Sequence, residues 1–139
     1  MKPGRVVVIT GGSAGAGRAA ARAFAQKGFQ VGLLARGLEL LEAARAEGES
    51  SGVRGMAIPT NVADADAVED AAARLEAGLG PVDVWVNSAM TSVFSPVHQL
   101  EAEEVRRVAE VTYLGSVNGI LAALRRMRPR NAGTIGQVG

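Results

Sequence analysis

The sequence predicts an α/β fold built on a doubly wound parallel sheet with strand order 3-2-1-4-5. Short β-branched runs alternate with stretches of helical spacing along the whole chain. The first run ends in a glycine-rich turn that opens a helix, and the 139 residues amount to one domain. Right-handed crossovers between parallel strands leave few other arrangements of these elements.

The first strand and the first helix are the best defined elements. Residues 5–9 (R-V-V-V-I) are too short for a helix and are followed by paired glycines, so they predict a buried, central strand. A turn from Thr10 to Gly17 comes next. Beyond it, alanines and Phe24 recur at helical spacing as far as Gly28, a suitable residue for the end of a helix.

Each glycine of the turn has a physical use. Gly11 and Gly12 permit a sharp turn, Gly15 lets backbone N–H groups approach a phosphate, and Gly17 lets the helix pack closely on the strand. The helix N-terminus adds unpaired N–H groups and the positive end of a dipole, which predicts an anion site. A P-loop is excluded, because Gly17 is followed by R-A where a Lys and a Ser or Thr are required. A dinucleotide is the expected ligand, and a plain structural turn is the alternative.

Residues 10–17 (T-G-G-S-A-G-A-G) resemble the T-G-x-x-x-G-x-G cofactor loop of the classical short-chain dehydrogenases/reductases. The resemblance implies a Rossmann-like fold, a nicotinamide dinucleotide cofactor and reduction of a carbonyl or oxidation of an alcohol. It also implies that the cofactor lies against this turn, with candidate binding residues Gly11, Ser13, Ala14, Gly15, Ala16 and Gly17.

The second strand, Gln30–Ala35, ends at a candidate cofactor-selecting residue, Arg36. In this architecture the residue about 20 positions beyond the glycines meets the adenosine ribose, where an acid favours a free 2′-hydroxyl and an arginine favours a 2′-phosphate. Arg36 therefore predicts NADP(H) in preference to NAD(H), and family members that prefer NADP often carry a basic residue here. The alternative is a solvated loop arginine.

The middle of the chain supplies a helix and two more expected contacts. Leu38–Ser50 predicts a helix and Val53–Ile58 a third strand. The resemblance aligns Asn61 and Val62 with the family's Asp-Val pair, whose acid binds the adenine amino group; the Asn61 amide oxygen can accept the same bond without the charge. Asp64 is expected to cap the next helix.

The fourth strand, Val82–Val86, is followed by N-S-A-M, which resembles the family's Asn-Asn-Ala-Gly turn. That turn joins the central strands and lines the nicotinamide ribose, which implies roles for Asn87, Ser88 and Ala89. Thr91–Gln99 predicts a loop.

A long helix is predicted from Glu101 to Met127. The family has an Asn in this helix that holds a water of the proton relay, and Thr112 occupies its place in the V-T-Y-L-G context. In the family this helix also forms a dimer surface, so a homo-oligomer through it is expected. The arginines at its end complement the helix dipole.

Residues 133–139 (G-T-I-G-Q-V-G) resemble the family's fifth strand, which leads into the catalytic serine. The family's Tyr-x-x-x-Lys pair has no counterpart, because the chain has one tyrosine, Tyr113, and its lysines are Lys2 and Lys27. We therefore expect residues 1–139 to be an NAD(P)-binding domain truncated before the catalytic Ser, Tyr and Lys, incomplete on the C-terminal side of the sheet and inactive alone. The alternative is a non-catalytic nucleotide-binding or interaction protein.

Composition argues against several other classes of protein, among them nucleic-acid-binding, metal-binding and membrane proteins. A net charge of +1, with no aromatic residues among the clustered arginines, gives no case for nucleic acid. The lack of cysteine removes disulfides and thiolate metal sites, and the lone His98 receives no role, so no metal is expected. No run approaches the ~18 apolar residues of a membrane span, and no signal-peptide cleavage site follows Arg5–Ile9. A cytoplasmic protein that binds no membrane is the expectation.

Overall fold

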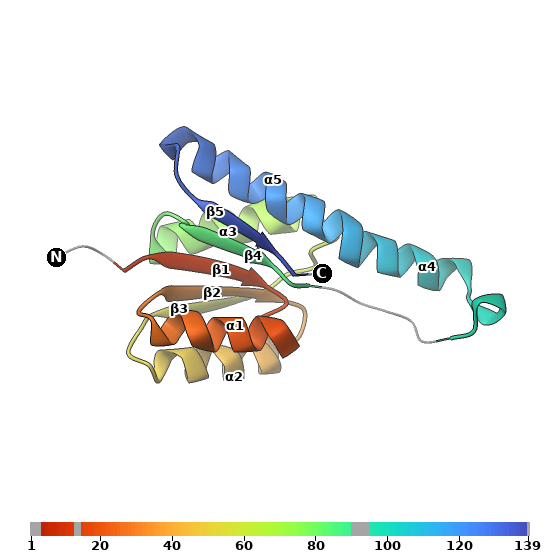
Figure 1. Ribbon diagram of the computed structural model, residues 1–139, viewed down its shortest axis with the longest axis horizontal. Coiled ribbons are helices and arrows are strands. Elements are labelled where there is room, and N and C mark those ends of the chain that lie inside the picture. Colours follow the sequence, from red (N-terminus) through yellow and green to blue (C-terminus); the bar gives the residue numbers. More distant parts are fainter. Residues whose placement is uncertain (1–3, 13–14, 90–94, 139) are drawn as a thin grey trace.

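The computed structural model describes residues 4–12, 15–89 and 95–138, and it contains one five-stranded parallel sheet in the order β3-β2-β1-β4-β5. This order confirms the predicted topology (Figure 1). The strands are β1 Val6–Thr10, β2 Gln30–Ala35, β3 Gly55–Pro59, β4 Val84–Asn87 and β5 Thr134–Gln137.

Helices cover both faces of this sheet (Figure 1). α1 (Gly15–Gln26) and α2 (Leu38–Glu49) lie on one face, where Val7, Ile9 and Leu33 point into the core with the α1 alanines. α3 (Ala65–Leu79) and α5 (Gly115–Met127) lie on the other, where Val8, Leu34 and the wholly buried Trp85 pack with Leu75 and Ala122. β1 is buried along its entire length, as its β-branched sequence predicts.

Local signals located most helix and strand ends to within two residues. β2 has the predicted bounds, and the Asp64 side chain caps α3 by accepting a hydrogen bond from the Ala67 N–H at 3.2 Å. β3 begins at Gly55, later than the predicted Val53, because pairing with β2 runs from Val31↔Gly55 to Ala35↔Pro59. Proline is tolerated at the end of β3 because β3 is an edge strand.

The prediction of one continuous α-helix from Glu101 to Met127 was wrong, because a π-helical segment interrupts it. This stretch consists of α4 (Ala102–Val108), the π-helical segment η2 (Ala109–Leu114) and α5, with the short 3₁₀ turns η1 (Val97–Gln99) before it and η3 (Arg128–Arg130) after it. A π-helical segment, with hydrogen bonds between residues i and i+5, is rare, and such segments are frequent at functional sites. α4 and η1 extend beyond the carboxyl ends of the strands (Figure 1).

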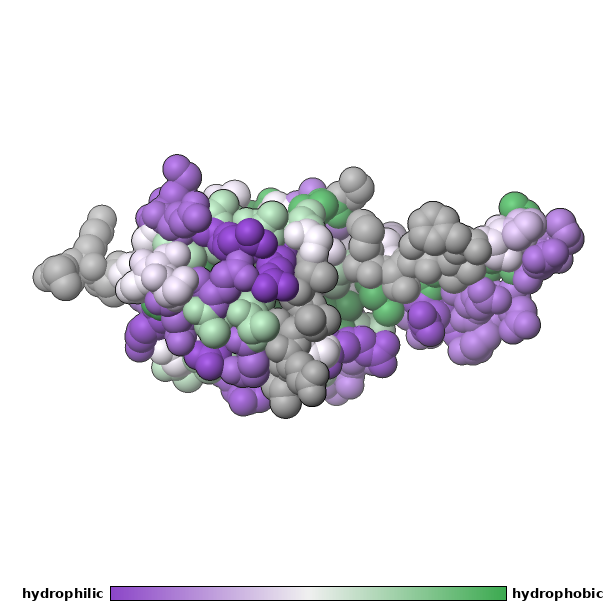
Figure 2. All heavy atoms as spheres, turned by 90° about the horizontal axis from the view of Figure 1, so that it is seen from below, coloured by the Kyte–Doolittle hydropathy of each residue, from purple (hydrophilic) through white to green (hydrophobic). Residues whose placement is uncertain are grey.

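The face formed by α1 and α2 carries hydrophilic side chains with smaller apolar patches among them (Figure 2). Figure 2 shows hydrophilic side chains over much of this face and along the projecting end that α4 forms. Among the helices that the structure describes, none is long and apolar enough to cross a membrane.

Candidate functional site

The carboxyl ends of β1 and β4 meet at the glycine-rich turn. Gly11 has a φ of 70°, and a Cβ there would lie 2.8 Å from the Ala89 Cα. A Cβ on Gly17 would lie 2.3 Å from the Gly11 carbonyl oxygen and 2.6 Å from the Ser88 Oγ. Both positions therefore exclude any side chain, because the start of α1 packs directly against the two strand ends.

A cleft of about 400 Å³ opens above this turn, at the carboxyl end of the sheet. It brings together nine of the residues that the sequence predicted for cofactor binding: Gly11, Gly15, Ala16, Gly17, Arg36, Asn61, Val62, Ser88 and Ala89. Ser13 and Ala14 lie outside the described residues. Four further residues complete the lining, and sequence reasoning missed them: Ala35, Thr60, Val111 and Val138.

The N-terminus of α1 forms the floor of the cleft. Gly15 and Ala16 are exposed there, and a Cβ built on Gly15 would meet no atom within 4 Å. The first turn of α1 contains no acidic residue. The unpaired N–H groups of a helix start and the positive end of its dipole attract an anion, so this floor can hold a phosphate.

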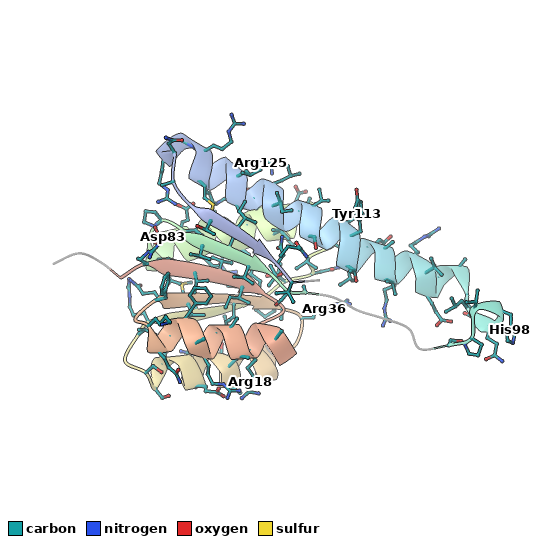
Figure 3. The ribbon with its side chains drawn as sticks, viewed as in Figure 1. Arg18, Arg36, Asp83, His98, Tyr113 and Arg125 are labelled. Carbon is teal, nitrogen blue, oxygen red and sulfur yellow. The ribbon has the colours of Figure 1, made fainter. Side chains whose placement is uncertain are left out.

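Two arginines stand near the turn, and they differ in their partners. The Arg18 Nη2 lies 2.7 Å from the Glu47 Oε2, and Arg22 pairs with the same carboxylate. The Arg18 hydrogen bond lowers the pKa of Glu47, although partial desolvation opposes it. Arg36 is exposed at the end of β2, and within the described part of the chain it forms no hydrogen bond or ion pair (Figure 3).

The turn after β3 forms the side of the cleft beyond Arg36. Thr60 and Val62 are buried, and the Thr60 hydroxyl donates to the Ile58 carbonyl at 2.9 Å. Asn61 is exposed, and its Oδ1 accepts a hydrogen bond from the Ala63 N–H at 3.1 Å. The Asn118 side chain of α5 donates to the Val62 carbonyl at 2.8 Å, which fixes this turn against the helix.

Asn87 was predicted as a cofactor contact, but it is buried and does not line the cleft. Its Oδ1 accepts from the Trp85 Nε1 at 2.9 Å, and its Nδ2 donates to the Ser116 carbonyl at 3.1 Å. A Cβ on Gly119 would lie 2.3 Å from the Asn87 Oδ1, so α5 can approach only because Gly119 has no side chain. In the structure Asn87 joins β4 to α5.

Val111 faces the cleft from η2, whereas Thr112 is not among the lining residues. The Ser116 hydroxyl donates to the Thr112 carbonyl at 2.8 Å and accepts from the Gln137 Nε2 at 3.1 Å. Tyr113 is 68% exposed on the long helix (Figure 3). Lys27 follows α1, at the opposite end of that helix from the turn.

Among the described residues, the cleft gathers neither a metal-binding cluster nor a tyrosine–lysine pair. Within residues 4–12, 15–89 and 95–138, no group of three or more His, Cys, Asp or Glu side chains could hold a metal ion. Neither Tyr113 nor Lys27 lines the cleft, so the two are not placed to act as a general acid and its neighbouring cation.

Comparison with known proteins agrees with this geometry. The family model described as short chain dehydrogenase matches residues 5–139. The 2,3-dihydro-2,3-dihydroxybenzoate dehydrogenase of Bacillus subtilis is 31% identical over 136 residues, which are 98% of this chain and 52% of the relative.

Two solved structures superpose over almost the whole chain. NAD⁺-bound xylitol dehydrogenase gives a TM-score of 0.92 at 26% identity, with 97% of this chain and 52% of that one covered. A variant of actinorhodin polyketide ketoreductase with NADPH gives 0.91 at 28% identity, covering 96% and 52%. The chain thus spans about half the length of these relatives, and their structures hold NAD⁺ in one case and NADPH in the other.

Proposed function

Because the chain belongs to the short chain dehydrogenase family, we propose that it is the NADP(H)-binding portion of a carbonyl or alcohol oxidoreductase. The cofactor lies in the cleft, with its pyrophosphate at the start of α1 and its adenosine ribose at Arg36. When bound, the nicotinamide supplies or accepts the hydride. The residues of this chain bind and orient the dinucleotide.

One observation carries the choice of NADP(H). Arg36 lines the cleft and has no ion-pair partner among the described residues, whereas Arg18 is already paired with Glu47. An unpaired guanidinium can form a bidentate, charge-assisted pair with a phosphate, and the 2′-hydroxyl of NAD(H) offers no charge to match. The cleft also fits the rest of the group, since its floor is a helix start without acidic residues.

Titration of the full chain with NADPH and NADH tests this proposal. We expect tighter binding of NADPH, and Arg36→Met should weaken it roughly tenfold to a hundredfold, the equivalent of a lost charge-assisted bond, while NADH binding stays unchanged. Arg107→Met is the matched control, because it removes the same charge from the exposed surface of α4. Equal affinities for the two cofactors before and after the Arg36 change would exclude Arg36 as the selecting residue.

We expect these residues alone to catalyse no hydride transfer. The single tyrosine, Tyr113, is exposed on the long helix, and Thr112 stands where the resemblance implies an Asn. These features also favour the second candidate, a non-catalytic nucleotide-binding protein of the same fold. Mixing the chain with NADPH and a panel of aldehydes and ketones tests for catalysis, which neither candidate predicts. Loss of NADPH absorbance that depends on the carbonyl compound would mean that catalysis occurs without a Tyr-x-x-x-Lys pair.

We also propose that a second copy of this chain pairs along the long helix. Large apolar side chains are exposed on it, and they are Val105, Tyr113, Leu114, Leu121 and Leu124. Burial of such a row in a symmetric contact removes apolar surface from water on both copies. Sedimentation of the wild type and of Leu121→Glu compares the oligomeric state, and a wild-type monomer at high concentration would contradict the pairing.

A further inference from the structure

We infer that Asn61 presents an amide N–H₂ donor to the base of the bound dinucleotide, so that a 6-oxopurine is accepted about as well as adenine. This inference rests on the proposed function, since it concerns the same cleft. Asn61 meets the base of the dinucleotide, whereas Arg36 meets the phosphate on its ribose. The inference also revises the expectation that the Asn61 oxygen would accept a bond from the adenine amino group.

The position of the base follows from the order of the other groups along the cleft. The helix start at Gly15 and Ala16 takes the pyrophosphate, and Arg36 at the end of β2 takes the substituted ribose. A dinucleotide that runs from β1 past β2 continues towards β3, the next strand of the sheet. The cleft residues on that side are Thr60, Asn61 and Val62.

Asn61 is the polar group of this turn that remains accessible. Thr60 is buried and its hydroxyl donates to the Ile58 carbonyl, while Val62 is buried and apolar. Asn61 is exposed and lines the cleft. A base that lies over the end of β3 therefore meets the Asn61 amide as its polar neighbour.

The hydrogen bond to Ala63 sets which end of this amide is available. The Asn61 Oδ1 accepts from the Ala63 N–H at 3.1 Å, and the described residues offer the Nδ2 no partner. Turning the amide over would lose this bond and place two donors against each other. The Nδ2 group is therefore the end that a base can engage.

A hydrogen-bond donor at this position can bind adenine and hypoxanthine alike, whereas an acceptor favours adenine. Adenine offers the N1 acceptor beside its 6-amino group, and hypoxanthine offers the O6 acceptor where adenine has that amino group, one position along the same edge. An amide N–H₂ can donate to either one. A carboxylate only accepts, so it suits the 6-amino group of adenine and repels O6 of hypoxanthine unless the base shifts along its edge.

The test is a calorimetric titration of the full chain with NADPH and with its hypoxanthine analogue, reduced nicotinamide hypoxanthine dinucleotide phosphate. For the wild type we expect dissociation constants within about threefold of each other, since both bases form one neutral hydrogen bond. Asn61→Asp keeps an acceptor for the Ala63 N–H and should raise the ratio of the hypoxanthine to the adenine constant by roughly fivefold to tenfold. Gln99→Glu makes the same chemical change in η1, at the projecting end of the molecule, and should leave the ratio unchanged.

The outcomes separate this inference from the proposed function. If wild-type NADPH binds tenfold or more tightly than the analogue, the inference is wrong and dinucleotide binding stands. If neither compound binds, the proposed function fails and the inference fails with it. The wild-type comparison needs no variant, and circular dichroism shows whether Asn61→Asp keeps the fold before its ratio is used.

Discussion

Thr10 and Ser88 hold the carboxyl ends of β1 and β4 together through hydrogen bonds that Ser88 donates and Thr10 accepts. Ser88 donates its backbone N–H to the Thr10 Oγ1 at 3.1 Å, and its own hydroxyl donates to the Thr10 carbonyl. The Ala89 N–H donates to the same Oγ1 at 3.2 Å. Because Thr10 is 2% exposed, water cannot easily replace it, and one buried hydroxyl fixes two residues that line the cleft.

Thr10→Val keeps the shape of this side chain and removes the acceptor. It leaves the Ala89 N–H without its partner and weakens the Ser88 link, so we expect the free energy of unfolding to fall by about 1–3 kcal/mol. Urea denaturation measures the change. Thr134→Val is the control, because Thr134 is exposed in β5 and its substitution should change stability by less than about 0.5 kcal/mol. Equal stability of the two variants would show that the Thr10 hydroxyl is not a structural tie.

Gly17→Ala tests the close approach of α1 to the strand ends. Alanine favours a helix by about 1 kcal/mol over glycine, but its Cβ would lie 2.3 Å from the backbone oxygen of Gly11, which cannot move aside without displacing the turn. We expect a net loss of about 1–3 kcal/mol in the free energy of unfolding.

Gly48→Ala in α2 is the matched control for this change. Its Cβ would meet only the Ala25 Cβ, at the ordinary contact distance of 4.0 Å, so helix propensity should raise stability by about 0.5–1 kcal/mol. Thermal melts of the two variants should therefore shift in opposite directions. A Gly17→Ala protein as stable as Gly48→Ala would mean that α1 can move away from the turn at little cost.

Features of the fold that depend on local residue patterns could be predicted from the sequence alone. Strand order follows from alternation of β-branched runs and helices, and the Asp64 cap needs only its own helix start. The grouping of Gly17, Arg36 and Asn61 at one cleft follows from their positions at the ends of parallel strands and at the helix start.

Long-range packing determines what the sequence could not predict. η2 interrupts the long helix as far as Leu114, and a Cβ on the next residue, Gly115, would lie 2.6 Å from the Val62 Cγ2, a contact with no local signature. Val111 and Val138 belong to apolar patterns that predict core positions, yet both line the cleft. The burial of Asn87 likewise depends on Trp85 and on the carbonyl of Ser116 in α5.

Glu69 connects α3 to the arginines near the end of α5, and this connection explains part of that basic cluster. The Arg126 Nη1 lies 2.8 Å from the Glu69 Oε2, Arg125 pairs with the other carboxylate oxygen, and the Arg126 Nη2 donates to the Glu69 backbone carbonyl at 3.2 Å. Arg126 also lies 3.3 Å from Glu76. Since the Arg126 side chain is mostly buried, its ion pairs are screened less than surface pairs.

Acid should weaken the contact between α3 and α5 through Glu69. Burial raises the pKa of Glu69, but the hydrogen bonds from Arg126 and Arg125 outweigh it and lower the pKa below the ordinary value of 4.5. A carboxyl with a lowered pKa in the folded state stabilises the protein above its unfolded pKa, and this contribution is lost as the pH falls through the folded value. We therefore expect the difference in free energy of unfolding between the wild type and Glu69→Gln to be constant near neutral pH and to shrink as the pH falls below about 4.5. Urea denaturation from neutral to acidic pH measures this difference.

Glu103→Gln is the control for this prediction. It changes an exposed ion pair of 3.9 Å in α4, so its stability should differ little from that of the wild type at every pH. A Glu69→Gln difference that stays the same at every pH would mean that the carboxylate charge contributes nothing to the contact between the two helices.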